Sequence, residues 1–411
     1  FSDNNIAISG ILFIFLLTIF SFMSRKIITG VKPTGSSMHL GNLMGAVLPF
    51  KNIAEKNDSA IFIADLHAIT SVKDGNTLRD QSFELAVEYF SIFGIDSDIK
   101  IFRQSDIQNI TKLMWILANV TPYSLMRRAH SFKESEQKIE WKQKILFEIQ
   151  ARREFIEENK NNTNVFTSEY ISIYNESKED DELFLRIQEN LKEIEQMKEE
   201  LYSTINMWVF NYPILMAADI VGYGCDGVPV GKDQVQHLEM TRDMVRNFNK
   251  IYGKEIFIEP EAIVTEWLAT LPGTDGRKMS KSYDNFIGVF DDEKTMKKRV
   301  MSITTDSLWV DDIKNPDTCN VFALIEVFWN PDEVETIRQK YLTPNIGFGY
   351  GHAKSALLDI LQRYLSGYRE ARENLLKHPE VVEEKLRLGA IEMNKRLDAK
   401  IQEVREVVGV N

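Results

Sequence analysis

Apolar residues in the first part of the chain follow two alternating patterns. Short runs of consecutive apolar residues predict buried strands at 26–30, 60–64 and 99–103. Apolar positions at helical spacing predict helices at 43–50, 81–93 and 110–117. This alternation is typical of a doubly wound parallel sheet of the Rossmann type. We therefore predict an α/β domain over residues 25–296.

The pattern changes from about residue 297 onward. Strand-like runs end there, and helical spacing recurs at 321–329, 331–340, 352–375 and 381–408. Asn330 followed by Pro331 is typical of a helix N-terminus. The sequence therefore predicts an all-α domain over residues 297–411.

Residues 134–206 form a charged insertion inside the α/β domain. Apolar residues recur in it at spacings of three, four and seven, as at Ile187, Leu191, Ile194 and Leu201. This pattern predicts an antiparallel helical hairpin. The sequence leaves open whether the hairpin contacts a nucleic acid, a partner subunit or only solvent, and a solvated appendage is the simplest interpretation.

The N-terminal residues are unusually apolar. Residues 6–23 are an almost unbroken apolar run, whose length reaches the lower limit of a membrane span. One interpretation is a signal anchor. The chain begins with Phe1, however, and Met23 stands just ahead of the first predicted strand. These features favour a second interpretation, in which residues 1–24 are an extension that has no catalytic role or is absent from the mature protein. We therefore expect no membrane association.

The composition agrees with a soluble enzyme. The chain of 411 residues exceeds the size of one hydrophobic core, and its fractions of apolar (44%) and charged (27%) residues are ordinary. Cys225 and Cys319 stand far apart, so the sequence indicates neither a disulfide framework nor a zinc site, and we expect a cytoplasmic protein. A net charge of −12 argues against a general nucleic-acid coat protein, yet it permits RNA binding through a local basic surface.

Two lysines stand three residues apart in the segment Gly276-Arg277-Lys278-Met279-Ser280-Lys281-Ser282. Lysine is a mobile point charge, and a Gly- and Ser-rich loop lets it close on a polyphosphate as charge develops in a transition state. A solvated basic turn would have a similar composition. The loop alone therefore leaves both interpretations open.

A second candidate element follows the first predicted strand, where Gly35, His39, Gly41 and Asn42 precede an apolar helix. A strand, a Gly- and Ser-rich turn and a helix N-terminus form an anion-binding arrangement. A single histidine beside glycines is more often structural than functional. The element gains meaning only from its combination with the lysine loop.

The two elements together resemble the signature motifs of the class I aminoacyl-tRNA synthetases. A third segment, Tyr212-Pro213-Ile214-Leu215-Met216-Ala217-Ala218-Asp219-Ile220, followed by residues 228–237, resembles the substrate pocket of the tryptophan-specific members. The resemblance implies ATP-dependent activation of L-tryptophan and transfer to tRNA(Trp), with Mg²⁺ bound to ATP. It also implies a homodimer, and a C-terminal helical domain that recognises the anticodon.

Asp219 is the candidate specificity residue. A carboxylate in an apolar helical run is costly unless it has a hydrogen-bond partner, which could equally be internal to the protein. The resemblance implies that Asp219 accepts the indole N–H of tryptophan. An amino acid without that donor would leave a buried acceptor unpaired, which can reject it by about four orders of magnitude.

The resemblance assigns the remaining site residues. For catalysis it implies Lys278, Lys281, Ser280 and His39. For ATP it implies Lys32, Thr34, Gly35, His39, Gly41, Asn42, Asp233, Lys278, Met279, Ser280, Lys281 and Ser282. For tryptophan it implies Asp219, Tyr212, Met216, Gln234, His67, Val228 and Val230. Lys32 departs from the glutamine of many relatives, and the loop before His39 is one residue longer than usual.

Two alternatives remain at this stage. The tyrosine-specific sister enzyme shares both signature motifs, and an inactive paralogue could bind ligands without turnover. ATP–pyrophosphate exchange with each amino acid separates these possibilities.

Overall fold

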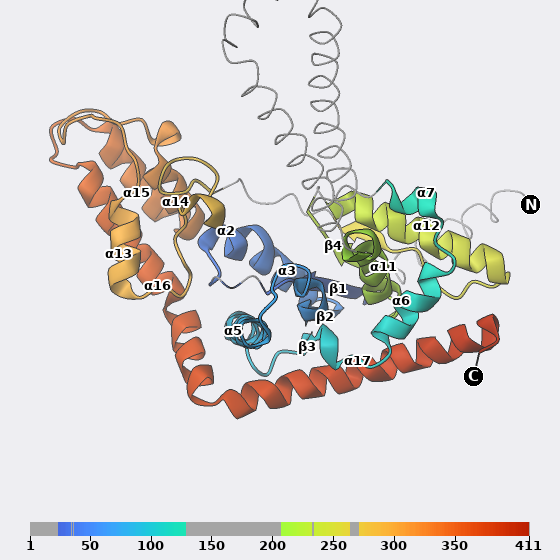
Figure 1. The fold of residues 1–411 in the computed structure, drawn as a ribbon. Helices are drawn as coiled ribbons and strands as arrows, with labels where there is room; N and C mark the ends of the chain where they lie inside the picture. The colour runs from blue at the N-terminus through green and yellow to red at the C-terminus, as the bar shows by residue number, and fades with distance from the viewer. Residues whose placement is uncertain are drawn as a thin grey trace, which may run out of the picture. The chain divides into compact units, whose positions relative to one another are not determined.

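The computed structural model describes residues 24–33, 35, 37–128, 207–231, 234–263 and 271–410 (Figure 1). Contacts divide the chain into two compact units, one of residues 1–113 with 218–411 and one of residues 114–217. The apolar N-terminal run and the expected hairpin at 134–206 lie outside the described residues. Among the helices that the structure describes, none has the length and apolar character of a membrane span.

A parallel sheet of five strands organises the first unit. The strand order is β3-β2-β1-β4-β5, and every neighbouring pair is parallel. The strands are β1 (Lys26–Val31), β2 (Asp58–Ile63), β3 (Lys100–Arg103), β4 (Gly227–Pro229) and β5 (Glu261–Ile263). This order confirms the predicted doubly wound fold, with its switch point between β1 and β4. The three predicted strands are present, whereas β4 and β5 are too short to stand out in the sequence.

The inner strands are buried on both faces, which explains their continuous apolar runs. In β2, five of the six residues are buried, and Ile27 and Ile28 of β1 are at most 1% exposed. Gly30 of β1 faces the ring of Phe62 on β2, where a Cβ would lie 2.2 Å from Cζ. The close packing of β1 on β2 therefore requires glycine at this position.

Helices connect the strands (Figure 1). After β1 the chain forms α2 (Leu40–Asn42), a π-helical turn (Leu43–Val47) and α3 (Leu48–Ala54). The wide turn is followed by Leu48 and then by Pro49, which has no N–H to donate to the helix. The other helices described between β2 and β5 in the sequence are α4 (Asp65–Ala68), α5 (Gly75–Phe93), α6 (Ile110–Ala118), α7 (Tyr123–Met126), α11 (Met207–Val221) and α12 (Val235–Tyr252).

The described residues after 297 contain helices and no strand, as predicted. These helices are α13 (Glu293–Met301), α14 (Asn320–Phe328), α15 (Pro331–Leu342), α16 (Tyr350–Lys377) and α17 (Pro379–Val408). The four predicted helices match α14 to α17 to within two residues at each end. Helix α16 packs on α5, and α17 runs along β3 (Figure 1). The contacts group this region with the sheet, and the division at residue 297 stays a prediction.

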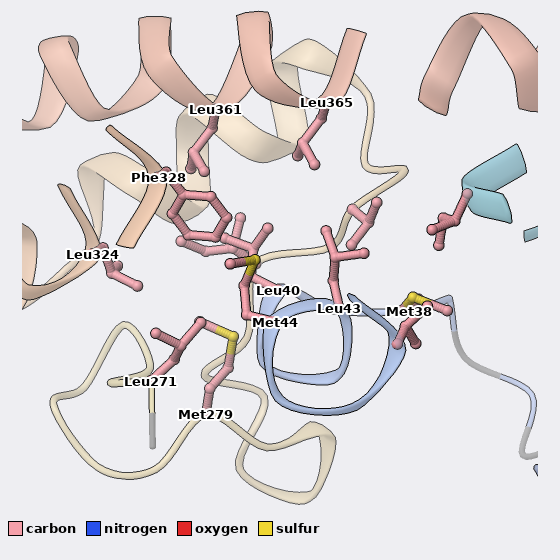
Figure 2. Close-up of a cluster of buried hydrophobic side chains, with 14 of the residues drawn as sticks. Met38, Leu40, Leu43, Met44, Leu271, Met279, Leu324, Phe328, Leu361 and Leu365 are labelled. Carbon is pink, nitrogen blue, oxygen red and sulfur yellow. The ribbon is translucent and has the colours of Figure 1, made fainter. Parts of the chain in front are cut away.

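One hydrophobic cluster joins the signature segments to the C-terminal helices (Figure 2). Met38, Leu40 and Leu43 enter it from the loop and helix after β1, and Met279 enters it from the lysine loop. The C-terminal helices contribute Leu324, Phe328, Leu361 and Leu365. The position of both signature segments therefore depends on the packing of α14 and α16.

Candidate active site

His39 caps the helix that follows the first signature loop. Its Nδ1 accepts the Asn42 backbone N–H at 3.2 Å, and Asn42 Oδ1 accepts the His39 backbone N–H at 3.4 Å. This reciprocal cap requires Nδ1 without a proton, so the neutral ring carries its hydrogen on Nε2. Burial, together with the charge of Lys281, lowers the pKa of His39 to about 4. His39 is therefore a neutral hydrogen-bond donor at physiological pH.

Asn285 holds the lysine loop in shape. Its side chain accepts the Ser280 N–H at 2.8 Å and donates to the Lys278 carbonyl at 3.1 Å and to Asp275 at 2.7 Å. Asn285 is 2% exposed. A Cβ on Gly273 would lie 2.3 Å from Asn285 Nδ2, so only glycine fits beside it. Sequence reasoning missed Asn285, although it stands shortly after the loop that its side chain holds.

Residues 286–289 bring the two signature elements together. The Leu40 N–H donates to the Ile287 carbonyl at 2.9 Å, and the Val289 N–H donates to the Met38 carbonyl at 2.8 Å. Met279 is 4% exposed and inserts its side chain into the shared hydrophobic cluster (Figure 2). The lysine loop is therefore anchored at its centre, and the assignment of Met279 to ATP stays a prediction that its buried side chain does not favour.

A cavity of about 480 Å³ lies beside these elements. Four residues that were assigned to ATP line it, namely Lys32, Gly35, Asn42 and Lys281. Burial lowers the pKa of both lysines. Lys32 stands where many relatives carry glutamine, and its Nζ donates to Thr70 Oγ1 at 3.0 Å. The cavity thus combines two lysines and the N-terminal end of a helix, which suit phosphate, with the carboxylates of Asp80, Glu84 and Glu88.

Asp219 is buried, and it has internal partners. Gln104 Nε2 donates to both carboxylate oxygens, at 2.8 and 2.7 Å, and His67 Nε2 donates to Oδ2 at 3.0 Å. Burial raises the pKa of Asp219, while the hydrogen bonds from His67 and Gln104 oppose the rise. A carboxylate offers about four acceptor positions, so these three bonds leave room for a further donor.

Gln104 is a site residue that sequence reasoning missed. It follows β3 directly, and it is 1% exposed. The segment with His67 follows β2, and Lys32 follows β1. The carboxyl ends of parallel strands share one edge, where ligands bind in open α/β sheets. Position after a strand was therefore the available signal for Gln104.

The other predicted residues are less completely described. Val228 and Val230 are buried, and Gln234 directly precedes α12. Tyr212 and Met216 lie on α11 in the second unit, where the Tyr212 and Trp208 ring centres are 6.2 Å apart. The Ser282 N–H donates to Ser280 Oγ at 3.3 Å. Thr34 and Asp233 lie outside the described residues, and the ligand contacts of all these residues stay predictions.

Comparisons with known sequences and structures bear on the family and the fold. The sequence profile described as tRNA synthetases class I (W and Y) matches residues 24–149 and 174–366. The tryptophan–tRNA ligase of Fusobacterium nucleatum is 35% identical over 94% of this chain and 98% of its own length. The crystal structure of Campylobacter jejuni tryptophanyl-tRNA synthetase complexed with ADP and tryptophan is 33% identical, with a TM-score of 0.73 over 94% of this chain and 100% of that one. The Mycoplasma pneumoniae enzyme, at 20% identity and a TM-score of 0.63, shares the fold.

We expect His39 to stay neutral until the pH falls to about 4. Because this pKa lies below the ordinary value of 6.5, the unfolded chain binds a proton first, and the folded protein should lose stability as the pH falls from 6.5 towards 4. NMR titration of the ring, assigned with a His39→Asn variant, measures the pKa. A midpoint near 6.5 would contradict the burial argument.

Proposed function

This chain belongs to the class I tRNA synthetases of tryptophan and tyrosine, and from that premise we propose that it is a tryptophan–tRNA ligase. It activates L-tryptophan with ATP to tryptophanyl-adenylate and transfers the tryptophanyl group to tRNA(Trp). The choice of tryptophan rests on the buried carboxylate of Asp219, which Gln104 and His67 hold at the carboxyl edge of the sheet. Curated relatives at 33–35% identity, matched over 94% of this chain, are tryptophan–tRNA ligases.

Asp219 favours an amino acid whose ring has an N–H. Gln104 and His67 fix the orientation of its carboxylate, so a ring donor that enters meets a preformed acceptor. Tyrosine and phenylalanine carry no N–H in the ring. Phenylalanine would gain no bond to the carboxylate and would place apolar surface beside a buried charge, which is unfavourable. Tyrosine would carry its donor, the phenolic O–H, at the tip of its ring rather than at the place of the indole N–H.

Activation requires positioning and charge stabilisation rather than an enzyme nucleophile. The carboxylate of tryptophan attacks the α-phosphorus of ATP, a new C–O–P linkage forms, and the bond to the β-phosphate oxygen breaks to release pyrophosphate. Lys281 and Lys278 would stabilise the charge that develops on pyrophosphate, and neutral His39 would donate from Nε2. Electrostatic stabilisation of this kind is usually the largest catalytic contribution.

ATP would occupy the cavity lined by Lys32, Gly35, Asn42 and Lys281. Mg²⁺ would accompany ATP, bound mainly by its phosphates and by water. No group of three or more His, Cys, Asp or Glu side chains in the described ranges is arranged to hold a metal ion. The proposal assigns the metal to the nucleotide, because Mg²⁺ is usually held by substrate phosphates and water.

Transfer requires a surface for tRNA on a chain with a net charge of −12. Helix α13 offers a local one, because Lys294, Lys297 and Lys298 on it are exposed. We assign recognition of the anticodon to the helical region that begins there. Because the proposed enzyme supplies translation, we propose that it acts in the cytoplasm.

We also propose that the enzyme is a homodimer. The second unit exposes large apolar side chains, with Trp115 at 72%, Tyr123 at 64% and Met207 at 67% exposure. Aromatic residues and methionine are enriched in protein interfaces. The family resemblance implies a homodimer, so we propose that a second copy of the chain covers this surface.

A charge in this surface should dissociate the dimer. We expect Trp115→Glu to shift the enzyme from dimer to monomer at micromolar concentration in sedimentation velocity, because an unpaired charge would enter a desolvated interface. Trp309→Glu is the matched control, since Trp309 is 80% exposed on the other unit and should leave the mass unchanged. A monomeric parent protein would contradict the proposal.

ATP–pyrophosphate exchange tests the assignment as a whole. We expect exchange that depends on tryptophan and is at least a thousandfold less efficient with tyrosine, since a site that hydrogen-bonds a substrate rejects analogues by about four orders of magnitude. Exchange with tyrosine alone would identify the sister enzyme. A folded chain that binds ATP without exchange would identify an inactive paralogue.

Substitutions of Asp219 test its role in specificity. We expect Asp219→Asn to weaken tryptophan binding by about 1.5–3 kcal/mol, the usual worth of a hydrogen bond to a charged group. Asp219→Ala should bring the efficiencies with tryptophan and with its benzothiophene analogue, which lacks the ring N–H, close together.

The control for this pair is Asp226→Asn. The Asp226 carboxylate is 42% exposed and pairs with Arg25, so this variant should keep the parent's preference. Circular dichroism establishes that each variant is folded. If both Asp219 variants keep the parent's ratio of the two substrates, Asp219 is a structural residue.

A further inference from the structure

Glu88 is a buried carboxylate beside a cavity that should bind phosphates. It lies on α5, it is 3% exposed, and it lines the same cavity as Lys281. A buried charge of this kind is costly unless neighbouring groups compensate it, and a negative charge next to a polyphosphate is unfavourable in itself. The position therefore calls for a functional explanation.

The carboxylate holds the backbone that leads into His39. Glu88 Oε1 accepts the Ser37 hydroxyl at 2.8 Å and the Met38 N–H at 3.1 Å, and Oε2 lies 3.3 Å from the same nitrogen. On its other side, Met38 accepts the Val289 N–H. The segment before His39 is thus held between α5 and the strand-like residues that follow the lysine loop.

Glu88 also acts electrostatically on Lys281. The pKa of Lys281 is lowered by burial and raised by the charge of Glu88. Burial raises the pKa of Glu88, while its hydrogen bonds and the charges of Arg372 and Lys281 oppose the rise. Arg372 of α16 also pairs with Glu84 at 2.5 Å, and Lys32, Asp80 and Glu84 line the same cavity. Lys281, a lysine of the signature loop, therefore shares the cavity with the Glu88 carboxylate.

We propose that Glu88 is a positioning residue for activation, which couples the loop before His39 to Lys281. Its hydrogen bonds fix the loop, and its charge draws Lys281 towards the cavity before ATP binds. The phosphates of ATP then compete with Glu88 for the lysine, so that Lys281 meets them from a defined starting position. This inference rests on the proposed function for its catalytic consequence, whereas the coupling itself is a property of the protein without substrates.

Lysine labelling tests the coupling without relying on activity. Glu88→Gln keeps the shape of the side chain and removes its charge, so Lys281 should lose its proton more easily and react faster with an acetylating reagent at pH 8. The acetylation ratio of Lys281 to Lys278, measured by mass spectrometry, should rise at least twofold. Glu373→Gln removes an exposed carboxylate on α16 and is the matched control, in which the ratio stays constant. An unchanged ratio in Glu88→Gln overturns the proposal.

Exchange kinetics test the catalytic consequence. We expect Glu88→Gln to lower kcat at least tenfold, with the KM for tryptophan within twofold of the parent and an unchanged or higher melting temperature. In a Lys281→Met background the same substitution should change kcat less than twofold, because its partner is absent. An equal loss in both backgrounds, or a loss explained by a smaller folded fraction, overturns the proposal. A parent without exchange would refute the proposed function, whereas the labelling ratio would still decide the coupling.

Discussion

Parallel pairing of β1 with both β2 and β4 is the constraint on which the site depends. Because neighbouring parallel strands end at the same edge, the segments that follow them converge there. Lys32 follows β1, His67 follows β2 and Gln104 follows β3, whereas Val228 lies on β4 itself. None of these residues is close to another in sequence. The sheet alone makes them neighbours, and the buried contact of Gly30 with Phe62 shows how closely its inner strands pack.

A second set of contacts attaches the lysine loop to that edge. Backbone hydrogen bonds join residues 38–40 to residues 287–289, and Met279 anchors the loop in a cluster that the C-terminal helices complete. The helical region that we assign to tRNA therefore shares a core with the segments that would bind ATP.

Three buried polar groups of the candidate site are accommodated in two different ways. Burial raises the pKa of Asp219, and hydrogen bonds from His67 and Gln104 oppose the rise. Burial also raises the pKa of Glu88, and a hydroxyl and a backbone N–H oppose it there. His39 instead stays neutral, and its cap with Asn42 fixes which nitrogen carries the hydrogen. Each solution satisfies the rule that a buried polar group needs a partner.

The sequence by itself determined the fold class, three of the five strands, the C-terminal helices and the lysine loop, because their patterns are local and periodic. Lys278, Lys281, His39 and Asp219 were predicted as site residues through the resemblance of their segments to a known family, and their roles stay predictions. Only the tertiary structure decided that Gln104 hydrogen-bonds Asp219, that Asn285 holds the lysine loop and that Glu88 lines the same cavity as Lys281. Strands β4 and β5 were also missed, since three residues carry too little periodicity to predict a strand. The physical reason is the same throughout: a hydrogen bond between residues 115 positions apart, such as that of Gln104 with Asp219, leaves no mark on the local sequence and exists only once the strands have paired.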